Sequence, residues 1–340
     1  MKPMNRYRFV AGALIGVVGL AVGYWLATYV HPFGLQPWMV RQQSLHVFVF
    51  SVRDLVTRTI LTPAFFIVIA VTLTLERLFP AEPNQAIFSV NVAQDLVWFF
   101  YETILQAIVI ATYVQLLTIV YQQYFRFLTI NPAGHWPSWV RFAVSLLLLD
   151  FLYWGQHYTN HKVPLFWSFH TVHHSQKRLN FFTDFRYHVL EYIVRHTWLV
   201  IPFLVLRVDP PQIVWFAIVA RWYTRFYHGN IRTNLGPLRY VLVTPQSHRI
   251  HHSIEPRHRD TNFGALFSVW DQLLGTQYRG YDEYPETGIE DEGFPHERIV
   301  DVKSLMLRPL IQMAYPLRQI RKERAAFRSS RNRAADRPAA

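Results

Sequence analysis

HYTNHKVPLFWSFHTVHH, residues 157–174, is the stretch that decides the fold, and HRIHH at residues 248–252 repeats its histidine-rich character later in the chain. Eleven of the sixteen histidines lie between positions 157 and 252. Neutral imidazole is the commonest side-chain metal ligand. Eight clustered imidazoles are too many for one ion and suit two, so the sequence predicts a site for two metal ions. The clusters are His157-x3-His161, His170-x2-His173-His174 and His248-x2-His251-His252.

Helical spacing unites each cluster, because positions i, i+3 and i+4 share one face of a helix. We therefore expect each cluster to direct two or three nitrogens toward a common centre. Imidazole suits zinc, copper, iron and nickel, whereas structural zinc is satisfied by four ligands. A zinc-protease H-E-x-x-H motif is absent, since His296-Glu297 is followed by Arg298-Ile299-Val300. Two iron ions fit the number of ligands best.

The composition is that of a membrane protein. Hydrophobic residues make up 51% of the 340 residues and charged residues 16%, against about 25% charged in a typical soluble domain. The chain has no cysteine, which excludes disulfides, thiolate zinc sites and a cysteine nucleophile. A redox reaction would then draw its electrons from a separate protein. The net charge of +12 is concentrated toward the two ends, which favours contact with anionic lipid over nucleic acid.

Six apolar segments predict a multi-span helical bundle, that is, an all-α integral membrane protein. The first segment is long enough to span a bilayer and too long for a signal peptide, so we interpret it as a retained anchor. Asp209-Pro210-Pro211 separates the last two segments and predicts a hairpin. With a cytoplasmic N-terminus, six crossings place the C-terminus and all three histidine clusters on the cytoplasmic side. The segments are 9–30, 59–75, 97–121, 139–156, 189–206 and 212–224.

Three regions follow from this pattern. Residues 1–135 form an N-terminal transmembrane region of about three spans, and residues 136–282 form a histidine-rich catalytic domain. Residues 283–340 form a C-terminal cytoplasmic surface segment. Within the polar end of the chain we expect an acidic loop at 282–292, an amphipathic surface helix at 301–320 and a disordered basic tail over the last 20 residues.

The histidine clusters and their flanking residues resemble the fatty acid hydroxylase/sterol desaturase superfamily of membrane di-iron oxygenases. The resemblance covers residues 140–280 and is specific in combination, although a single histidine cluster would not be. It rests on Asp150-x2-Tyr153-Trp154-x2-His157-x3-His161, Phe166-Trp167-x2-His170-x2-His173-His174-Ser175, His248-x2-His251-His252, Asn262-Phe263-Gly264 and Trp270-Asp271-x2-Leu274-Gly275-Thr276.

The resemblance implies two iron ions at the cytoplasmic membrane face, with zinc a possible occupant of the isolated protein. It also implies O2-dependent attack on an unactivated C–H bond of a lipid: a fatty acyl chain, sterol, ether lipid or carotenoid. The product would be an alcohol or a double bond. Ferredoxin, or cytochrome b5 with its reductase, would supply electrons. The alternatives are a metal-handling membrane protein and a non-oxidative, zinc-occupied member of the same fold.

The expected ligands are the eight clustered histidines together with His228, which precedes Asn230 after the predicted hairpin. We expect no catalytic residue beyond these ligands. His188 stays open between a metal-related and a structural role, because Val189 replaces the proline of the family's R-x-H-P-x-E. His258 lies in an exposed-looking basic run and is not expected to be a ligand. Carboxylates and amides that would orient imidazoles, or else serve only as helix caps and loop residues, are Asp150, Asn160, Asn180, Glu191, Asn230 and Asp271.

Overall fold

The structure is a computed structural model that describes residues 63–335, apart from 87–88, 110–112, 131–134, 207–219, 221 and 298–300. The described residues are helical, and they form three isolated antiparallel bridges without any β-strand. This confirms the all-α class for these residues. The predicted first span, 9–30, and most of the predicted sixth segment with its Pro210-Pro211 break lie outside the described residues.

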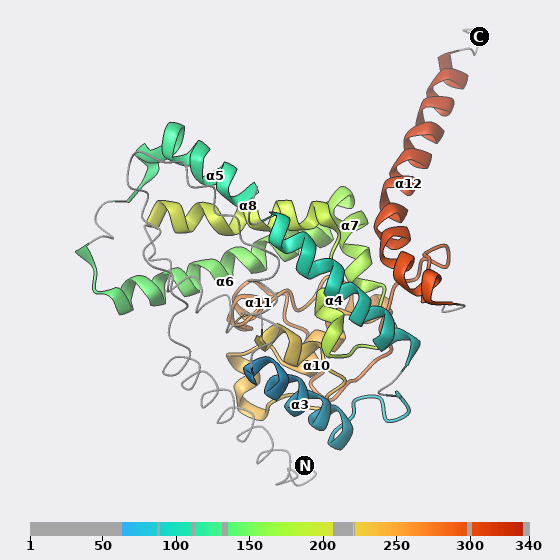
Figure 1. Ribbon diagram of the computed structural model, residues 1–340, viewed down its shortest axis with the longest axis horizontal. Helices are drawn as coiled ribbons and strands as arrows, with labels where there is room; N and C mark the ends of the chain where they lie inside the picture. The colour runs from blue at the N-terminus through green and yellow to red at the C-terminus, as the bar shows by residue number, and fades with distance from the viewer. Residues whose placement is uncertain are drawn as a thin grey trace.

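The helices form a body from which one long helix projects (Figure 1). Short 3-10 and π turns connect several of them, and residues 222–228 are also helical. In chain order the α-helices with printed bounds are α3 (Pro63–Leu78), α4 (Val90–Val109), α5 (Gln115–Val120), α6 (Ser138–Lys162), α7 (Pro164–His174), α8 (Val189–Leu206), α10 (Pro245–His251), α11 (Val269–Leu273) and α12 (Val302–Ala335). The shorter turns are η3 (Tyr121–Phe125), η4 (Arg126–Leu128), η6 (Phe181–Phe185), η7 (Gly236–Tyr240) and η8 (Pro256–His258).

Helices α6 and α8 pack side by side, and α7 turns back from the end of α6 (Figure 1). The turn is made by Val163, whose backbone is extended, followed by Pro164 at the first position of α7. Proline is favoured there because its fixed φ suits a helix and its missing N–H would have no partner within the helix. The turn brings the histidines at the end of α6 next to those of α7.

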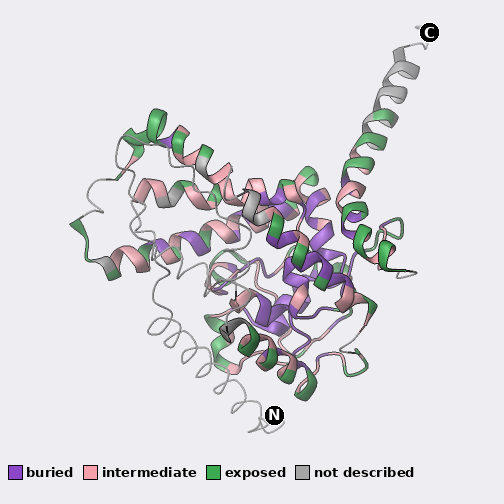
Figure 2. Ribbon diagram, viewed as in Figure 1, coloured by how far each residue is buried: buried purple, intermediate pink, exposed green. Residues whose placement is uncertain are grey.

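The buried core lies between α4, α7 and the segment that follows α7, where Figure 2 shows buried residues gathered. Its centre contains aromatic residues from α4 and from η6, together with two residues of the C-terminal loop. A second, smaller cluster joins the end of the helical segment 222–228 to two later residues. The first cluster consists of Trp98, Phe99, Val172, Phe181, Phe185, Ile289 and Phe294, and the second of Phe226, Tyr227, Ile231 and Val243.

A buried polar network joins three distant segments of the chain. Arg186 is fully buried and forms ion pairs with Asp95 on α4 and with Glu297 near the C-terminal end. Its Nη1 also donates a hydrogen bond to Ser175, directly after α7. Asn180 caps η6 through its side chain and donates a second hydrogen bond to Asp95. The network therefore fixes α4, α7 and η6 relative to one another.

Many large apolar side chains face outward on the helical body. They include Phe100 on α4, Leu116 on α5, Trp139 and Leu147 on α6, and Ile201 on α8. Large apolar side chains exposed in such number are typical of contact with a membrane or with another protein. Among the described residues, one helix, α8, has the length and apolar composition needed to cross a bilayer.

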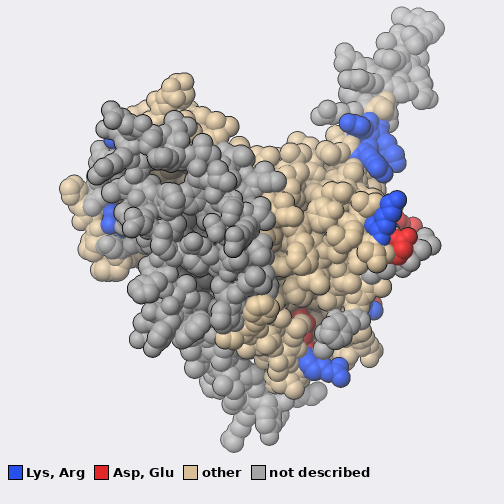
Figure 3. Space-filling view, viewed as in Figure 1, with Lys and Arg blue, Asp and Glu red and all other residues tan. Residues whose placement is uncertain are grey.

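Helix α12 extends further than the sequence predicts. We expect a helix at 301–320 and disorder beyond it, but α12 continues to Ala335. The expectation of disorder is wrong for residues 321–335, because alanine, arginine, lysine and glutamate, which dominate this segment, are strong helix formers. Basic side chains lie on the part of α12 nearest the helical body (Figure 3). The acidic segment 282–292 contains no helix, as predicted.

Candidate metal centre

Four helical segments deliver nine histidines to the interior of the fold. The end of α6 carries two of them, α7 carries three, and residues 222–228 end on His228. The N-cap of α10 is Thr244, whose side chain accepts a hydrogen bond from Ser247 N in a capping box. Because α10 is short, this cap determines where His248, His251 and the C-terminal residue His252 point.

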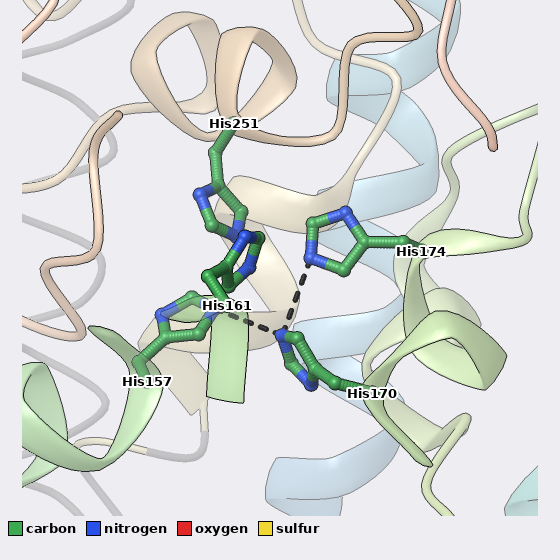
Figure 4. A group of neighbouring side chains, drawn as sticks. All are labelled: His157, His161, His170, His174 and His251. Carbon is green, nitrogen blue, oxygen red and sulfur yellow. Dashed lines mark hydrogen bonds between the residues drawn. The ribbon is translucent and has the colours of Figure 1, made fainter. Parts of the chain in front are cut away.

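The nine imidazoles form two groups, in each of which the ligand atoms lie within 4.8 Å of one another. Helix α7 contributes to both groups, and so does the α10 segment. Neighbouring helix positions are rotated by about 100°, so adjacent histidines point to different centres. The prediction that each sequence cluster converges on one centre is confirmed for His157 and His161, but it is wrong for the other two clusters, whose members are divided between the two groups. The first histidine group is His157, His161, His170, His174 and His251 (Figure 4), and the second is His173, His228, His248 and His252.

The distances between imidazole nitrogens match those expected around a metal ion. In the first group, Nε2 of His170 lies 3.1 Å from Nε2 of His157 and 3.2 Å from Nε2 of His174 (Figure 4). In the second, Nε2 of His228 lies 3.2 Å from that of His173 and 2.8 Å from that of His248. Two nitrogens that bind one ion with bonds of about 2.1 Å are about 3.0–3.4 Å apart. Both groups are thus compact enough to hold an ion each.

Several imidazoles are oriented through their other nitrogen, Nδ1. The carbonyl oxygen of Phe263 lies 3.0 Å from Nδ1 of His157, and that of Thr261 lies 2.8 Å from Nδ1 of His251. A carbonyl oxygen can only accept, so Nδ1 carries the proton and Nε2 keeps its lone pair for a metal. His228 is held in the same way, since its Nδ1 lies 2.6 Å from a backbone carbonyl in its own helix.

Burial keeps these imidazoles neutral. It lowers the pKa of His251 to about 3, and it lowers the pKa of His174 and His252, with the help of neighbouring imidazoles, well below the usual value. Several buried ring nitrogens also have no hydrogen-bond partner, among them Nε2 of His161 and Nε2 of His251. Neutral imidazoles with unpartnered buried nitrogens are a set of donors that fits metal ions.

Carboxylates lie around the two groups and contribute charge. Glu191 Oε1 lies 2.7 Å from Nδ1 of His170 and also accepts a hydrogen bond from Asn160. Asp184 lies 3.7 Å from Nδ1 of His228, and Asp260 lies 3.7 Å from Nδ1 of His161. Glu191 and Asn160 are among the partners predicted from the sequence, whereas Asp184, Asp260 and the three backbone carbonyls are not. A carbonyl leaves no trace in the residue types, so sequence reasoning had no signal for it.

Replacing Glu191 by Ala is expected to weaken metal retention. The variant removes the carboxylate that fixes the tautomer of His170, and loss of such an outer partner typically costs about 10–100-fold in metal affinity. A chelator titration followed by metal analysis measures the change. The matched control is Glu255→Ala, which removes a surface carboxylate paired with Arg257. Equal metal retention in both variants would contradict the role assigned to Glu191.

The segment Asn262-Phe263-Gly264 supports the first histidine group through its backbone. Asp271 accepts hydrogen bonds from the N–H groups of Phe263 and Gly264, at 2.8 and 2.7 Å, which fixes the carbonyl that faces His157. A Cβ at Gly264 would lie 2.7 Å from the carbonyl oxygen of Phe267, so only glycine fits. Asp150 holds the following residues by accepting from Leu266 N and Phe267 N. Asp271 and Asp150 therefore position the loop and do not contact an imidazole directly.

Other predicted residues lie away from the two groups. Asn180 caps η6, and Asn230 binds the backbone of Glu82 through its side chain. His188 belongs to neither group, because its Nε2 faces the carbonyl of Met313 on α12 and its Nδ1 accepts from Leu190 N. His258 is likewise outside the groups, but it is fully buried and not exposed as expected. Its two ring nitrogens face Ser253 and Glu283, whose polar groups allow its burial.

Two openings reach the imidazoles. A cleft of about 490 Å³ reaches His161, His174 and His251, and its walls come from α7, from polar loops after α10 and from α12. A smaller cavity of about 60 Å³ is lined by residues of α6, α7 and α8 and reaches His170 and His173, among others. The centre is therefore accessible both from the polar part of the fold and from the region of the apolar helices.

Residues around the two histidine groups are similar to those of known proteins. The family model described as fatty acid hydroxylase matches residues 142–276. An ornithine lipid hydroxylase of Rhizobium tropici is 31% identical over 141 residues, which are 42% of this chain and 43% of the relative. The alkylglycerol monooxygenase of Homo sapiens is 30% identical over 141 residues, which are 42% of this chain and 31% of the relative.

A more distant relative is the Delta(7)-sterol 5(6)-desaturase of Gibberella zeae, 25% identical over 150 residues, which are 44% of this chain and 40% of the relative. The chain thus spans less than half the length of these curated relatives. No solved structure matches the chain.

Proposed function

Residues 142–276 belong to the fatty acid hydroxylase/sterol desaturase superfamily, and from this premise we propose that the chain is an O2-dependent membrane oxidoreductase that hydroxylates or desaturates a C–H bond of a lipid. The observation that carries the proposal is the pair of buried histidine groups. Two iron ions bound there would supply the oxidising power for attack on an unactivated C–H bond.

The residues of the chain would bind the metal ions, orient the imidazole ligands and enclose the centre. The nine imidazoles hold the two ions, with His228 as a full member of the second group. The carbonyl of Phe263 and the carboxylate of Glu191 hold His157 and His170 in the tautomer that leaves Nε2 free. Seven of the nine histidines are buried, which limits the access of bulk water and so protects a reactive centre from side reactions.

The membrane setting follows from the apolar surface of the helical body and from α8. We propose a multi-pass protein whose termini and metal centre lie on the cytoplasmic side. The lipid substrate enters from the bilayer past the apolar helices. An external donor, a ferredoxin or cytochrome b5 with its reductase, supplies electrons, because the chain contains no cysteine to hold an iron–sulfur cluster.

A metal-handling membrane protein is the alternative, and the geometry disfavours it. A transport site places ionisable ligands midway along spanning helices. Here the histidines lie at the end of α6, on the short α7 and in the segment 245–252. Their carboxylate and carbonyl partners fix them rigidly, as a catalytic centre requires. A non-oxidative, zinc-occupied protein of the same fold is tested by the experiment below.

The experiment supplies the purified protein, reconstituted with iron in lipid nanodiscs, with isotopically labelled O2, a reductase and donor, and host lipid extract. We expect O2 uptake that depends on the reductant, together with one lipid that gains a labelled oxygen atom or loses two hydrogens. Mass spectrometry of the lipids reads both outcomes. Two bound irons with no oxygen uptake in any lipid extract would overturn the proposal and favour metal handling.

A further inference from the structure

Arg195 is a cationic residue that the metal centre leaves unused. It lies on α8, the described helix long and apolar enough to cross a bilayer. An arginine at such a position is costly and almost always faces the protein interior or a cavity. Its Nε is buried without a hydrogen-bond partner, and no described residue forms an ion pair or hydrogen bond with its guanidinium.

Three tyrosine rings hold the guanidinium in place. Its central carbon lies 5.4 Å from the ring centroid of Tyr153, 4.8 Å from that of Tyr187 and 5.5 Å from that of Tyr192. Such contacts attract a cation through the ring faces and use none of its N–H groups. The side chain is therefore positioned while its hydrogen-bond donors stay available.

Arg195 lines the same cavity as imidazoles of both histidine groups. The cavity of about 60 Å³ reaches His157 and His170 of the first group and His173 and His228 of the second. Ordinary ligand pockets measure roughly 300–1,000 Å³. A space this small, so close to the imidazoles, suits a few atoms of a head group better than a long acyl chain.

The charge of the cavity favours an acidic group. Three carboxylates line it, those of Asp150, Asp184 and Glu191, and each already accepts hydrogen bonds from the fold. One oxygen, Oε2 of Glu191, is left without a partner and can accept from a hydroxyl or amino group of the same head group. Two divalent cations outweigh three carboxylates in formal charge, so Arg195 adds to a positive excess.

We propose that Arg195 binds an acidic group of the substrate, a carboxylate or a phosphate, and that the carbon to be oxidised lies within a few bonds of this head group. The planar guanidinium matches both groups in geometry, since it donates parallel hydrogen bonds to two oxygens. This assignment rests on the proposed function, because the bound molecule is a substrate only if the protein oxidises it. The binding of an acidic group itself does not depend on any oxidation.

The test uses three probes with one tail and different heads: octanoate, octyl phosphate and octanol. Each is titrated calorimetrically into the metal-loaded protein in nanodiscs without reductant, with empty nanodiscs as the blank. We expect at least one of the two acidic probes to bind more tightly than octanol. The preference between octanoate and octyl phosphate identifies the acidic group. Octanol binding as tightly as both acidic probes would overturn the proposal, and this comparison needs no variant.

Variants assign the effect to Arg195. Arg195→Gln is expected to weaken acidic-probe binding about tenfold or more while octanol binding stays unchanged, because a hydrogen bond to a charged group contributes about 1.5–3 kcal/mol. Arg195→Lys keeps the charge and should retain part of the preference. The matched control is Arg239→Gln, since Arg239 also stacks on two tyrosines, Tyr240 and Tyr281, but does not line the cavity.

The role of Arg195 and the proposed lipid oxidation can each be contradicted without the other. An unchanged acidic preference in Arg195→Gln, in protein with the wild-type melting temperature, would overturn the role of Arg195. If that variant does not fold, a folded Arg195→Lys protein decides instead: partial or full loss of the acidic preference supports the role of the guanidinium, and an unchanged preference with unchanged affinity overturns it. Selective binding of an acidic probe by a protein that consumes no O2 would overturn the proposed oxidation and support the binding site.

Discussion

Replacing His251 by Ala removes one metal ion of two and lowers lipid oxidation by more than about 100-fold. His251 is the α10 member of the first histidine group, and its unpartnered Nε2 lies among the Nε2 atoms of the other members. Loss of an outer partner alone typically costs about 10–100-fold, so loss of a ligand should cost more. Metal analysis by mass spectrometry and the labelled-O2 assay measure the two effects on the same preparation.

The two-group geometry makes this prediction specific. His248→Ala removes a member of the second group, three positions away on the same helix, and should also leave one ion, the one in the first group. The double variant should then lose both ions, while either single variant keeps one. His135→Ala serves as the control, because this histidine is exposed and far from both groups in sequence. Loss of both ions in each single variant would contradict two separable groups.

The sequence predicts the histidines better than their arrangement. Helical spacing identifies His170, His173 and His174 as metal-site residues, and the structure brings all three into the interior. It does not predict that His173 belongs to a different centre from its neighbours, because this depends on which segments surround each face of α7 in the fold. Spacing along one helix describes a face, whereas a metal site is made by the meeting of several helices.

Sequence pattern also does not predict the role of histidines that lie outside the three clusters. His228 and His188 each stand alone in the sequence, and local pattern separates them poorly. His228 joins the second group because its helix ends beside α10, whereas His188 is used to attach α12, through the carbonyl of Met313. The distinction comes from tertiary packing. Tertiary packing also determines the role of Asn180. Its side chain donates a hydrogen bond to Asp95, which lies 85 positions earlier in the chain.

The buried position of Arg186 predicts the largest loss of stability. Arg186→Met removes the cation between Asp95 and Glu297 and leaves two carboxylates buried without it. Breaking a buried ion pair by removing one partner costs about 3–5 kcal/mol. Since proteins are stable by only about 5–15 kcal/mol, we expect a large part of the protein to unfold near physiological temperature. Thermal melting in detergent, followed by circular dichroism at helix wavelengths, measures the loss.

Two further variants distinguish the effect of uncompensated charge from the effect of lost packing in this network. Arg259→Met removes an arginine paired with Glu290 on the surface, where both side chains are more than half exposed. Exposed pairs contribute about 0–1 kcal/mol, so this variant should melt close to the wild type. Adding Asp95→Asn and Glu297→Gln to Arg186→Met removes the uncompensated charges and should restore part of the stability. Equal melting of Arg186→Met with and without these changes would show that the guanidinium acts through packing. In that case the ion pairs would not be what fixes α4 and the C-terminal segment around the metal centre.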